Sequence, residues 1–186
     1  MSDIKSCFVS RFPDGVILET DFSQLEVIGL ALLSNDPVLI EDILAGRDMH
    51  RFFAAKLFNK EEKDVTSSER SLTKRLSFAL QYGSGANGLA KKNGITKEKA
   101  QEFIDYYYDR YTRVKEWQGE VYDEVIASRE ATGETTPRGW PRGRGQHLSP
   151  TGRVYTFVEK DKPEGWQGAD ASPDFNPPEI KNYPIN

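Results

Sequence analysis

The apolar residues of this chain recur at two spacings, and each spacing predicts a type of element. Residues 15–20, GVILET, form a short apolar and β-prone run, which predicts a strand. Residues 23–34, SQLEVIGLALLS, place their apolar side chains at helical intervals. Because Asp21 stands between the two runs, the pattern predicts a strand, a carboxylate at its end, and then a helix.

Three further helices are predicted before residue 85. One is expected over residues 38–44, ended by Gly46, and another begins after Asp48 and reaches Phe58. Thr66 and Glu69 have the spacing of a capping box, which predicts a helix that starts near residue 67. That helix is expected to continue to Gln81 or Tyr82 and to end at Gly83 and Gly85.

The second half of the chain changes character twice. Apolar residues at intervals of three and four over 97–128 predict one long amphipathic helix. Residues 135–150, TTPRGWPRGRGQHLSP, predict a loop that closes onto a hairpin, with residues 152–157, GRVYTF, as a strand. Residues 160–184 hold five prolines and little periodicity, and an irregular segment is expected there.

Length and composition set broad bounds. The 186 residues are enough for one compact domain or a piece of a larger one. No apolar run approaches the roughly 20 residues of a membrane span, and the start of the chain lacks the layout of a signal peptide, so a cytoplasmic protein is expected. Cys7 is the single cysteine, which excludes an intrachain disulfide and a cysteine metal cluster.

The charge is acidic in sum but not in distribution. A net charge of −4 by itself argues against a nucleic-acid-binding protein, since phosphates are contacted by Lys and Arg. From Arg70 to Lys97, however, six cations occur without one Asp or Glu. A local basic surface is therefore expected within an acidic protein.

Arg70, Lys74, Phe78 and Tyr82 are spaced by four along the predicted helix. Each step of four drifts by about 40°, so the set stays on one face. The two cations precede the two rings, and the N-terminal half of a helix already favours anions, which suits a triphosphate. The rings could then contact a base or sugar. The alternative is a solvated pair of cations followed by two rings that pack inward.

Asp21 also has two interpretations on its local sequence. A carboxylate at the end of a strand is suited to hold Mg²⁺, which prefers oxygen ligands and substrate phosphates. An aspartate before a helix is equally an ordinary N-cap. Residues 21–26 alone leave both open.

Taken together, these segments resemble family A DNA polymerases. Residues 21–31, DFSQLEVIGLA, are similar to motif A, and Arg70 with residues 74–83, KRLSFALQYG, is similar to motif B. Between them GRDMHRFFAAKLF resembles the G-x-D-x-H-R stretch, and NYPI near the end resembles the segment after the fingers. The resemblance covers roughly residues 8–186 and joins several motifs, so it is specific.

The resemblance implies an α+β fold that is predominantly α: helical fingers with a fragment of the palm sheet. Residues 1–34 would be the palm fragment with motif A, residues 35–133 the helical fingers with motif B, and residues 134–186 a loop, hairpin and return segment toward the palm. The implied activity is template-directed nucleotidyl transfer with two Mg²⁺ ions, acting on primer–template DNA and dNTP.

The resemblance also implies roles for individual residues. The implied catalytic residues are Asp21 and Lys74, and the implied metal ligands are Asp21 and the carbonyl of Phe22. Glu26 would exclude a ribose 2′-hydroxyl and pair with Tyr82, and phenylalanine at position 78 implies discrimination against dideoxynucleotides. The implied dNTP-binding residues are Ser23, Gln24, Glu26, His50, Arg70, Lys74, Phe78 and Tyr82, and the implied DNA-binding residues are Tyr82, Gly83 and Asn182.

The departures from the family pattern shape the expectation of activity. The family's histidine–aspartate turn, which supplies a second carboxylate, has no counterpart in the sequence, and Asn186 stands where the family usually has Gln. We therefore expect a polymerase piece, phage-type and split or truncated, that is inactive alone and needs a complementary polypeptide with the thumb and the remaining palm. The alternatives are a non-catalytic nucleotide- or DNA-binding remnant and a helical scaffold. Contact of Arg138, Arg142 and Arg144 with template phosphates is a further hypothesis, against an ordinary solvated loop.

Overall fold

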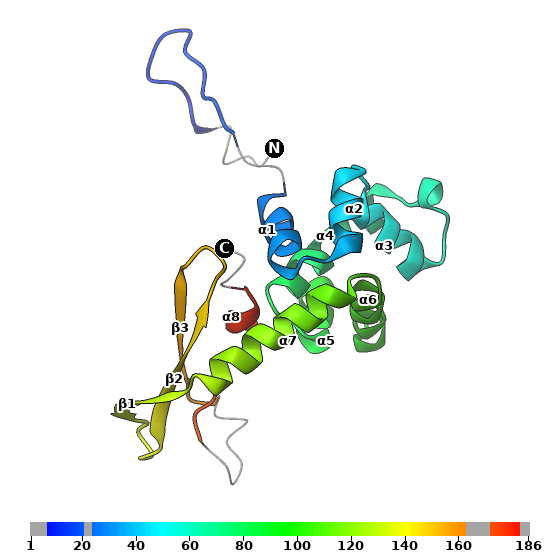
Figure 1. Cartoon of the computed structure of the whole chain (residues 1–186). Coiled ribbons are helices and arrows are strands. Elements are labelled where there is room, and N and C mark those ends of the chain that lie inside the picture. The colour runs from blue at the N-terminus through cyan, green and yellow to red at the C-terminus, as the bar shows by residue number, and fades with distance from the viewer. Residues whose placement is uncertain (1–6, 21–23, 163–171, 183–186) are drawn as a thin grey trace.

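The structure is a computed structural model that describes residues 7–20, 24–162 and 172–182. Helices make up most of it, and an antiparallel sheet stands beside them (Figure 1). The described helices are α1 (Leu25–Ser34), α2 (Pro37–Leu44), α3 (Met49–Phe58), α4 (Ser67–Gln81), α5 (Ala86–Asn93), α6 (Lys97–Arg110), α7 (Thr112–Ala127) and α8 (Pro177–Asn182), with a short 3₁₀ helix at Glu62–Asp64. The strands β1 (Glu130–Thr135), β2 (Pro141–Leu148) and β3 (Val154–Val158) pair in that order. This confirms the predicted α+β, predominantly α fold class; the predicted domain limits stay a prediction.

The first four helices form where the sequence predicts them, and side-chain caps explain where three of them begin. Asp36 accepts from the Leu39 N–H at 2.9 Å at the start of α2, and Asp48 accepts from the Arg51 N–H at 3.1 Å at the start of α3. Thr66 and Glu69 cap α4 reciprocally, as the capping box requires. Each cap satisfies a backbone N–H that has no partner within its own helix.

The predicted strand over residues 15–20 is wrong. The segment has no strand pairing, and Val16 and Leu18 are 88% and 84% exposed. It extends away from the helices, and the sheet of the described residues consists of β1, β2 and β3 alone (Figure 1). A strand needs a neighbour for its backbone groups, and the described chain offers none at this place.

The long helix predicted over residues 97–128 is two helices, α6 and α7, with a break at Tyr111 (φ −109°, ψ 65°). The cause lies far away in the sequence. Buried Asp42 of α2 accepts from Arg110 at 2.8 and 2.7 Å and from the Tyr111 hydroxyl at 2.8 Å. Because these bonds hold both residues at the break, periodicity alone does not reveal it.

A second buried carboxylate fixes the start of α7. Asp36 caps α2 with one oxygen, and its other oxygen accepts from the N–H groups of Arg113 at 3.0 Å and Val114 at 3.3 Å. One side chain thus satisfies the first turns of two helices. Around these polar anchors lies an aromatic core, in which the Phe53 ring stacks on Tyr107 with centroids 5.4 Å apart.

The Gly- and Arg-rich segment predicted as a loop is largely strand β2. Gly143 and Gly145 explain the discrepancy, because packing requires these two glycines, whereas Gly139 (φ 82°) lies in the turn. A Cβ on Gly145 would lie 2.1 Å from the carbonyl oxygen of Val125, so β2 can cross the end of α7 only without a side chain there. The sheet therefore lies against the C-terminal end of α7 (Figure 1).

Two smaller findings complete the fold. The segment predicted as irregular over residues 160–184 contains α8, which packs on α7. Among the helices of the described ranges, none combines the length and the apolarity that a membrane crossing requires.

Candidate nucleotide site on helix α4

Helix α4 presents the four residues of motif B along one side. Arg70 and Phe78 are half-buried, whereas Lys74 and Tyr82 are exposed. The Lys74 ammonium lies 5.8 Å from the centre of the Phe78 ring. The opposite side of the helix is buried and faces the core, through residues that include Thr73, Leu76, Ser77 and Leu80. The cations and rings therefore stay on the accessible side, and the interpretation in which both rings pack inward is not observed.

Arg70 is held at the start of this face by Asp48. Its Nε donates to the Asp48 carboxylate at 2.6 Å, across 22 residues of sequence. Burial by itself would raise the pKa of Asp48, but hydrogen bonds from Arg70 and from the Arg51 N–H outweigh it and hold that pKa below its usual range. The local sequence around Asp48 indicates only a helix cap and does not predict this contact with Arg70.

His50 of α3 reaches the same face. Its ring lies 6.0 Å from the Phe78 ring, at an angle of 41°. Burial lowers the pKa of His50, Arg70 and Lys74 lower it further, and Asp48 opposes them. Because this pKa lies below the ordinary 6.5, the neutral form of the imidazole prevails at pH 7.

Tyr82 joins the far end of this face to α1. Its hydroxyl donates to the Glu26 carboxylate at 2.5 Å, which confirms the predicted pair. This hydrogen bond is the main cause that raises the pKa of Tyr82 to about 12. The exposed residue Gln24 immediately precedes α1 in a left-handed conformation (φ 57°). The described part of motif A thus adjoins the Tyr82 end of motif B.

Gly83 lets the C-terminal segment approach the same end of α4. It has a φ of 76°, and a Cβ on it would lie 2.4 Å from the Cα of Pro178 in α8. Only glycine accommodates both the conformation and the contact. The structure thereby places α8, which ends at Asn182, beside Gly83.

Asp21, Phe22 and Ser23 lie outside the described residues, so their predicted roles stay predictions. Within residues 7–20, 24–162 and 172–182, no three His, Cys, Asp or Glu side chains gather as a metal ion would require. Glu26, the acid of motif A that is described, is engaged by Tyr82. The described side chains therefore do not make a magnesium site by themselves.

A basic surface adjoins the side of α4 that carries Arg70, Lys74 and Phe78, which we call the α4 face. The cations that form this surface on α4 and α5 are exposed: Lys74, Arg75, Lys91 and Lys92. We call these four residues the α4–α5 basic surface. Arg75 donates to the Asn93 side chain at 3.3 Å, which ties the middle of α4 to the end of α5. Among the described residues, none of the four has an acidic partner within 4.0 Å. Their charge is therefore available to an anionic partner.

The arginines of the second half are in a different situation. Arg142 lies on β2, donates to the carbonyl of Glu159 at 2.8 Å and forms an ion pair with Asp161 at 2.9 Å. Arg144 faces Glu130 at 3.4 Å. Arg138 lies in the turn between β1 and β2. The predicted flexible arginine loop is thus mainly a strand whose cations face acids.

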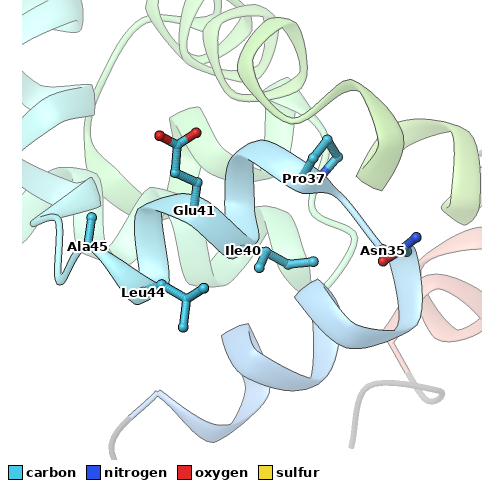
Figure 2. A pocket seen from close by; sticks show the side chains of 6 residues that line it. All are labelled: Asn35, Pro37, Ile40, Glu41, Leu44 and Ala45. Atoms are coloured by element: carbon cyan, nitrogen blue, oxygen red, sulfur yellow. The ribbon is translucent and has the colours of Figure 1, made fainter.

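The hollow shown in Figure 2 shares no lining residue with the α4 face. It runs along the outer side of α2 and is lined by Asn35, Pro37, Ile40, Glu41, Leu44 and Ala45. Its one charged side chain is Glu41, which would repel a phosphate. The hollow therefore does not suit a nucleotide.

The family to which the chain belongs follows from comparisons with known proteins. The family model described as DNA polymerase family A matches residues 1–138. The chain belongs to DNA polymerase family A. The match includes the whole α4 face and both helices that contribute His50 and Glu26, whereas β2, β3 and α8 lie beyond it.

Individual relatives match a shorter part of the chain than the family model does. The chain is 41% identical over 102 residues to DNA polymerase I of Borreliella burgdorferi, which covers 55% of this chain and 11% of that protein. It is 36% identical over 122 residues to DNA polymerase I of Geobacillus stearothermophilus, covering 66% of this chain and 14% of the relative. The chain thus spans about a tenth to a seventh of the length of these relatives.

A solved structure is similar as well. The POL domain of Pol1 from M. smegmatis, in complex with DNA primer–template and dNTP, matches 61% of this chain and 20% of its own, with 34% identity and a TM-score of 0.50. Sequence and fold therefore lead to the same family.

Proposed function

We propose that this chain is part of a DNA-directed DNA polymerase that binds Mg–dNTP on the α4 face and contributes to template-directed nucleotidyl transfer. The observation that carries the proposal is the face itself: Arg70, Lys74 and Phe78 on one side of a capped helix, with His50 beside them. Two cations and a neutral imidazole suit a triphosphate, and the rings suit a sugar and base. The solved relative with dNTP supports the same partner.

Successive residues along the helix would contact different parts of the nucleotide. Arg70, oriented by Asp48, and Lys74 would neutralise the triphosphate near the start of α4, where the helix dipole also favours an anion. Phe78 would lie against the sugar, and Tyr82 would hold Glu26 where it excludes a 2′-hydroxyl. Ser23 and Gln24 are proposed as further contacts. Lys74 would also stabilise negative charge that develops on the leaving phosphates.

Magnesium enters the proposal only as the family's cofactor. When bound, it would activate the primer hydroxyl and stabilise the departing pyrophosphate. Asp21 and the Phe22 carbonyl are the proposed ligands on this chain, and a further carboxylate is needed to offset the charge of two ions. We propose that another polypeptide, which carries the thumb and the rest of the palm, supplies it.

DNA is the second proposed partner. Tyr82, Gly83 and Asn182 are proposed to contact the template and primer end, since Gly83 and α8 adjoin. The α4–α5 basic surface would contact phosphates of the template ahead of this point. The expected location is the cytoplasm, which for a phage protein means that of the host cell.

Nucleotide binding by the purified chain tests the core of the proposal. Lys74→Gln should weaken binding of a fluorescent dNTP by about tenfold or more, because it removes a charge-assisted contact. Lys63→Gln is the matched control, since Lys63 belongs to the short 3₁₀ helix at Glu62–Asp64 and lies outside the α4 face. Equal affinity for both variants would contradict the nucleotide site.

Primer extension with a complementary polypeptide tests the enzymatic part. A mixture with a chain that carries the thumb and remaining palm should extend a primer, and Asp21→Ala should abolish extension. If a demonstrated complex extends no primer while dNTP still binds, the non-catalytic remnant becomes the better description.

A further inference from the structure

A small cavity lies beneath the α4 face, among α1, α2, α3, α4 and α6. Five of its lining side chains carry nitrogen or oxygen atoms: His50, Ser77, Gln81, Tyr107 and Tyr111, the last of which donates its hydroxyl hydrogen to Asp42. The cavity has room for about one water molecule. The cavity therefore adjoins both His50 and the buried side of α4.

Two of the polar atoms here are unsatisfied by the protein. The Nδ1 atom of His50 and the Oε1 atom of Gln81 are both buried, and neither has a hydrogen-bond partner in the part of the chain that the structure describes. Gln81 is 8% exposed. Buried polar atoms in proteins are nearly always hydrogen-bonded, to protein or to an internal water. Two such atoms on one cavity indicate a shared partner.

The other groups define what that partner must be. The Gln81 amide nitrogen donates to the Tyr107 hydroxyl at 3.3 Å. The amide oxygen is therefore the atom of Gln81 that still needs a donor. The Ser77 hydroxyl donates to the Thr73 carbonyl at 2.9 Å. The Tyr107 hydroxyl accepts from Gln81 and keeps its own hydrogen to donate. A partner must therefore donate to Gln81, and it can accept from Tyr107.

We propose that one buried water molecule donates to both Gln81 Oε1 and His50 Nδ1 and accepts from Tyr107, so that Gln81 is a positioning residue that fixes the His50 tautomer. In this arrangement both water hydrogens and the Tyr107 hydrogen have acceptors. If Nδ1 carried the hydrogen instead, the water would accept twice, and its second hydrogen would go to a hydroxyl oxygen such as that of Ser77, a weaker acceptor than an imidazole nitrogen. The network therefore favours the tautomer with the hydrogen on Nε2.

The charged surroundings of His50 support a neutral ring in which the tautomer matters. Burial lowers the pKa of His50, Arg70 and Lys74 of α4 lower it further, and Asp48 at the start of α3 raises it. Tyr107 of α6 stays protonated, since burial raises its pKa. A neutral His50 with hydrogen on Nε2 can donate to a phosphate oxygen. This last consequence rests on the proposed nucleotide site; the network itself does not.

The tautomer is measured directly by long-range ¹H–¹⁵N NMR of the two histidines of the full chain at pH 7.5. The wild type should show His50 with hydrogen on Nε2. Gln81→Met removes the acceptor at similar volume, and Tyr107→Phe removes the donor to the water. Both variants should lose the single tautomer and show a mixture.

A matched control separates this effect from the loss of any buried glutamine. Gln118 of α7 is 2% exposed and accepts from Tyr108 at 2.7 Å, outside this cavity. Gln118→Met should keep the wild-type His50 signals. Circular dichroism confirms that each variant is folded. If His50 carries its hydrogen on Nδ1 in the wild type, or if folded Gln81→Met and Tyr107→Phe keep the wild-type tautomer, the proposal is overturned.

The experiment uses no nucleotide, so its outcome is independent of the proposed function. Failure of dNTP binding in the Lys74 comparison would remove the function and leave the network. If the NMR result contradicts the network while dNTP binding is intact, only the proposed role of Gln81 is overturned.

Discussion

The α4–α5 basic surface and strand β2 are both rich in cations, yet their cations have different neighbours. On β2, Arg142 and Arg144 each face an acid, Asp161 and Glu130 respectively. On α4 and α5, Arg75 bonds to the amide of Asn93, and none of the four cations has an acidic partner among the described residues. The number of cations in a segment therefore says less about phosphate binding than the acids that the fold places beside them.

The largest expected effect is on DNA binding by the α4–α5 basic surface. The triple variant Arg75→Gln/Lys91→Gln/Lys92→Gln should bind single-stranded DNA about 100-fold more weakly at 0.1 M salt. The slope of log affinity against log salt should become shallower by about 2, because each lost phosphate contact removes about 0.7. Binding to a fluorescent oligo-dT across a salt series measures both.

The β2 arginines provide the contrast for that experiment. Arg142→Gln/Arg144→Gln should leave the salt slope unchanged, since their charges are already matched within the sheet. If the β2 variant loses affinity and the α4–α5 variant does not, the two regions have exchanged roles and the comparison is wrong.

The second-largest expected effect is a loss of stability when a buried carboxylate beside the sheet is removed. Glu159 is 5% exposed and accepts from Arg129 at 2.5 and 2.9 Å and from the Gly143 N–H at 2.6 Å. Glu159→Ala leaves the Gly143 N–H without a partner and should lower the free energy of unfolding by about 2 kcal/mol. The loss stays below that of a fully buried pair, because Arg129 remains partly solvated. Urea unfolding measures it, with the exposed Glu134→Ala as the control, which should stay within about 0.5 kcal/mol of wild type.

Acid should weaken the same part of the molecule. The Arg129 hydrogen bonds are the main cause that holds the pKa of Glu159 below its ordinary 4.5, although burial opposes them. A group with a depressed pKa stabilises the fold above its unfolded pKa and loses that contribution as pH falls. Stability should therefore decline as pH falls below about 4.5. The decline should be smaller in Glu159→Gln, and an identical pH profile for both proteins would contradict the role of Glu159.

The sequence predicts the helical half well because its signals are local. Thr66 and Glu69 define the start of α4 within a few residues, and the spacing of Arg70, Lys74 and Phe78 then defines the face. It fails where distant residues decide. The break at Tyr111 depends on Asp42, and the strand at residues 141–148 depends on the contact of Gly145 with the end of α7. Likewise, no local signal links Arg70 to Asp48.

The smallest expected effect concerns the Tyr82–Glu26 hydrogen bond, which joins the two family motifs. Tyr82 is 40% exposed, so Tyr82→Phe should cost only about 0.5 kcal/mol of stability. The titration is more informative: the hydrogen bond to Glu26 raises the pKa of Tyr82 to about 12, from an ordinary 10.0. A raised pKa stabilises the fold below the unfolded value, and this contribution disappears between about pH 10 and 12. In Glu26→Gln the Tyr82 phenol should ionise closer to pH 10, which NMR of the ring detects, whereas Glu41→Gln on α2 should leave it unchanged. Unaltered ionisation in Glu26→Gln would mean that motif A and motif B are not coupled through this bond in solution.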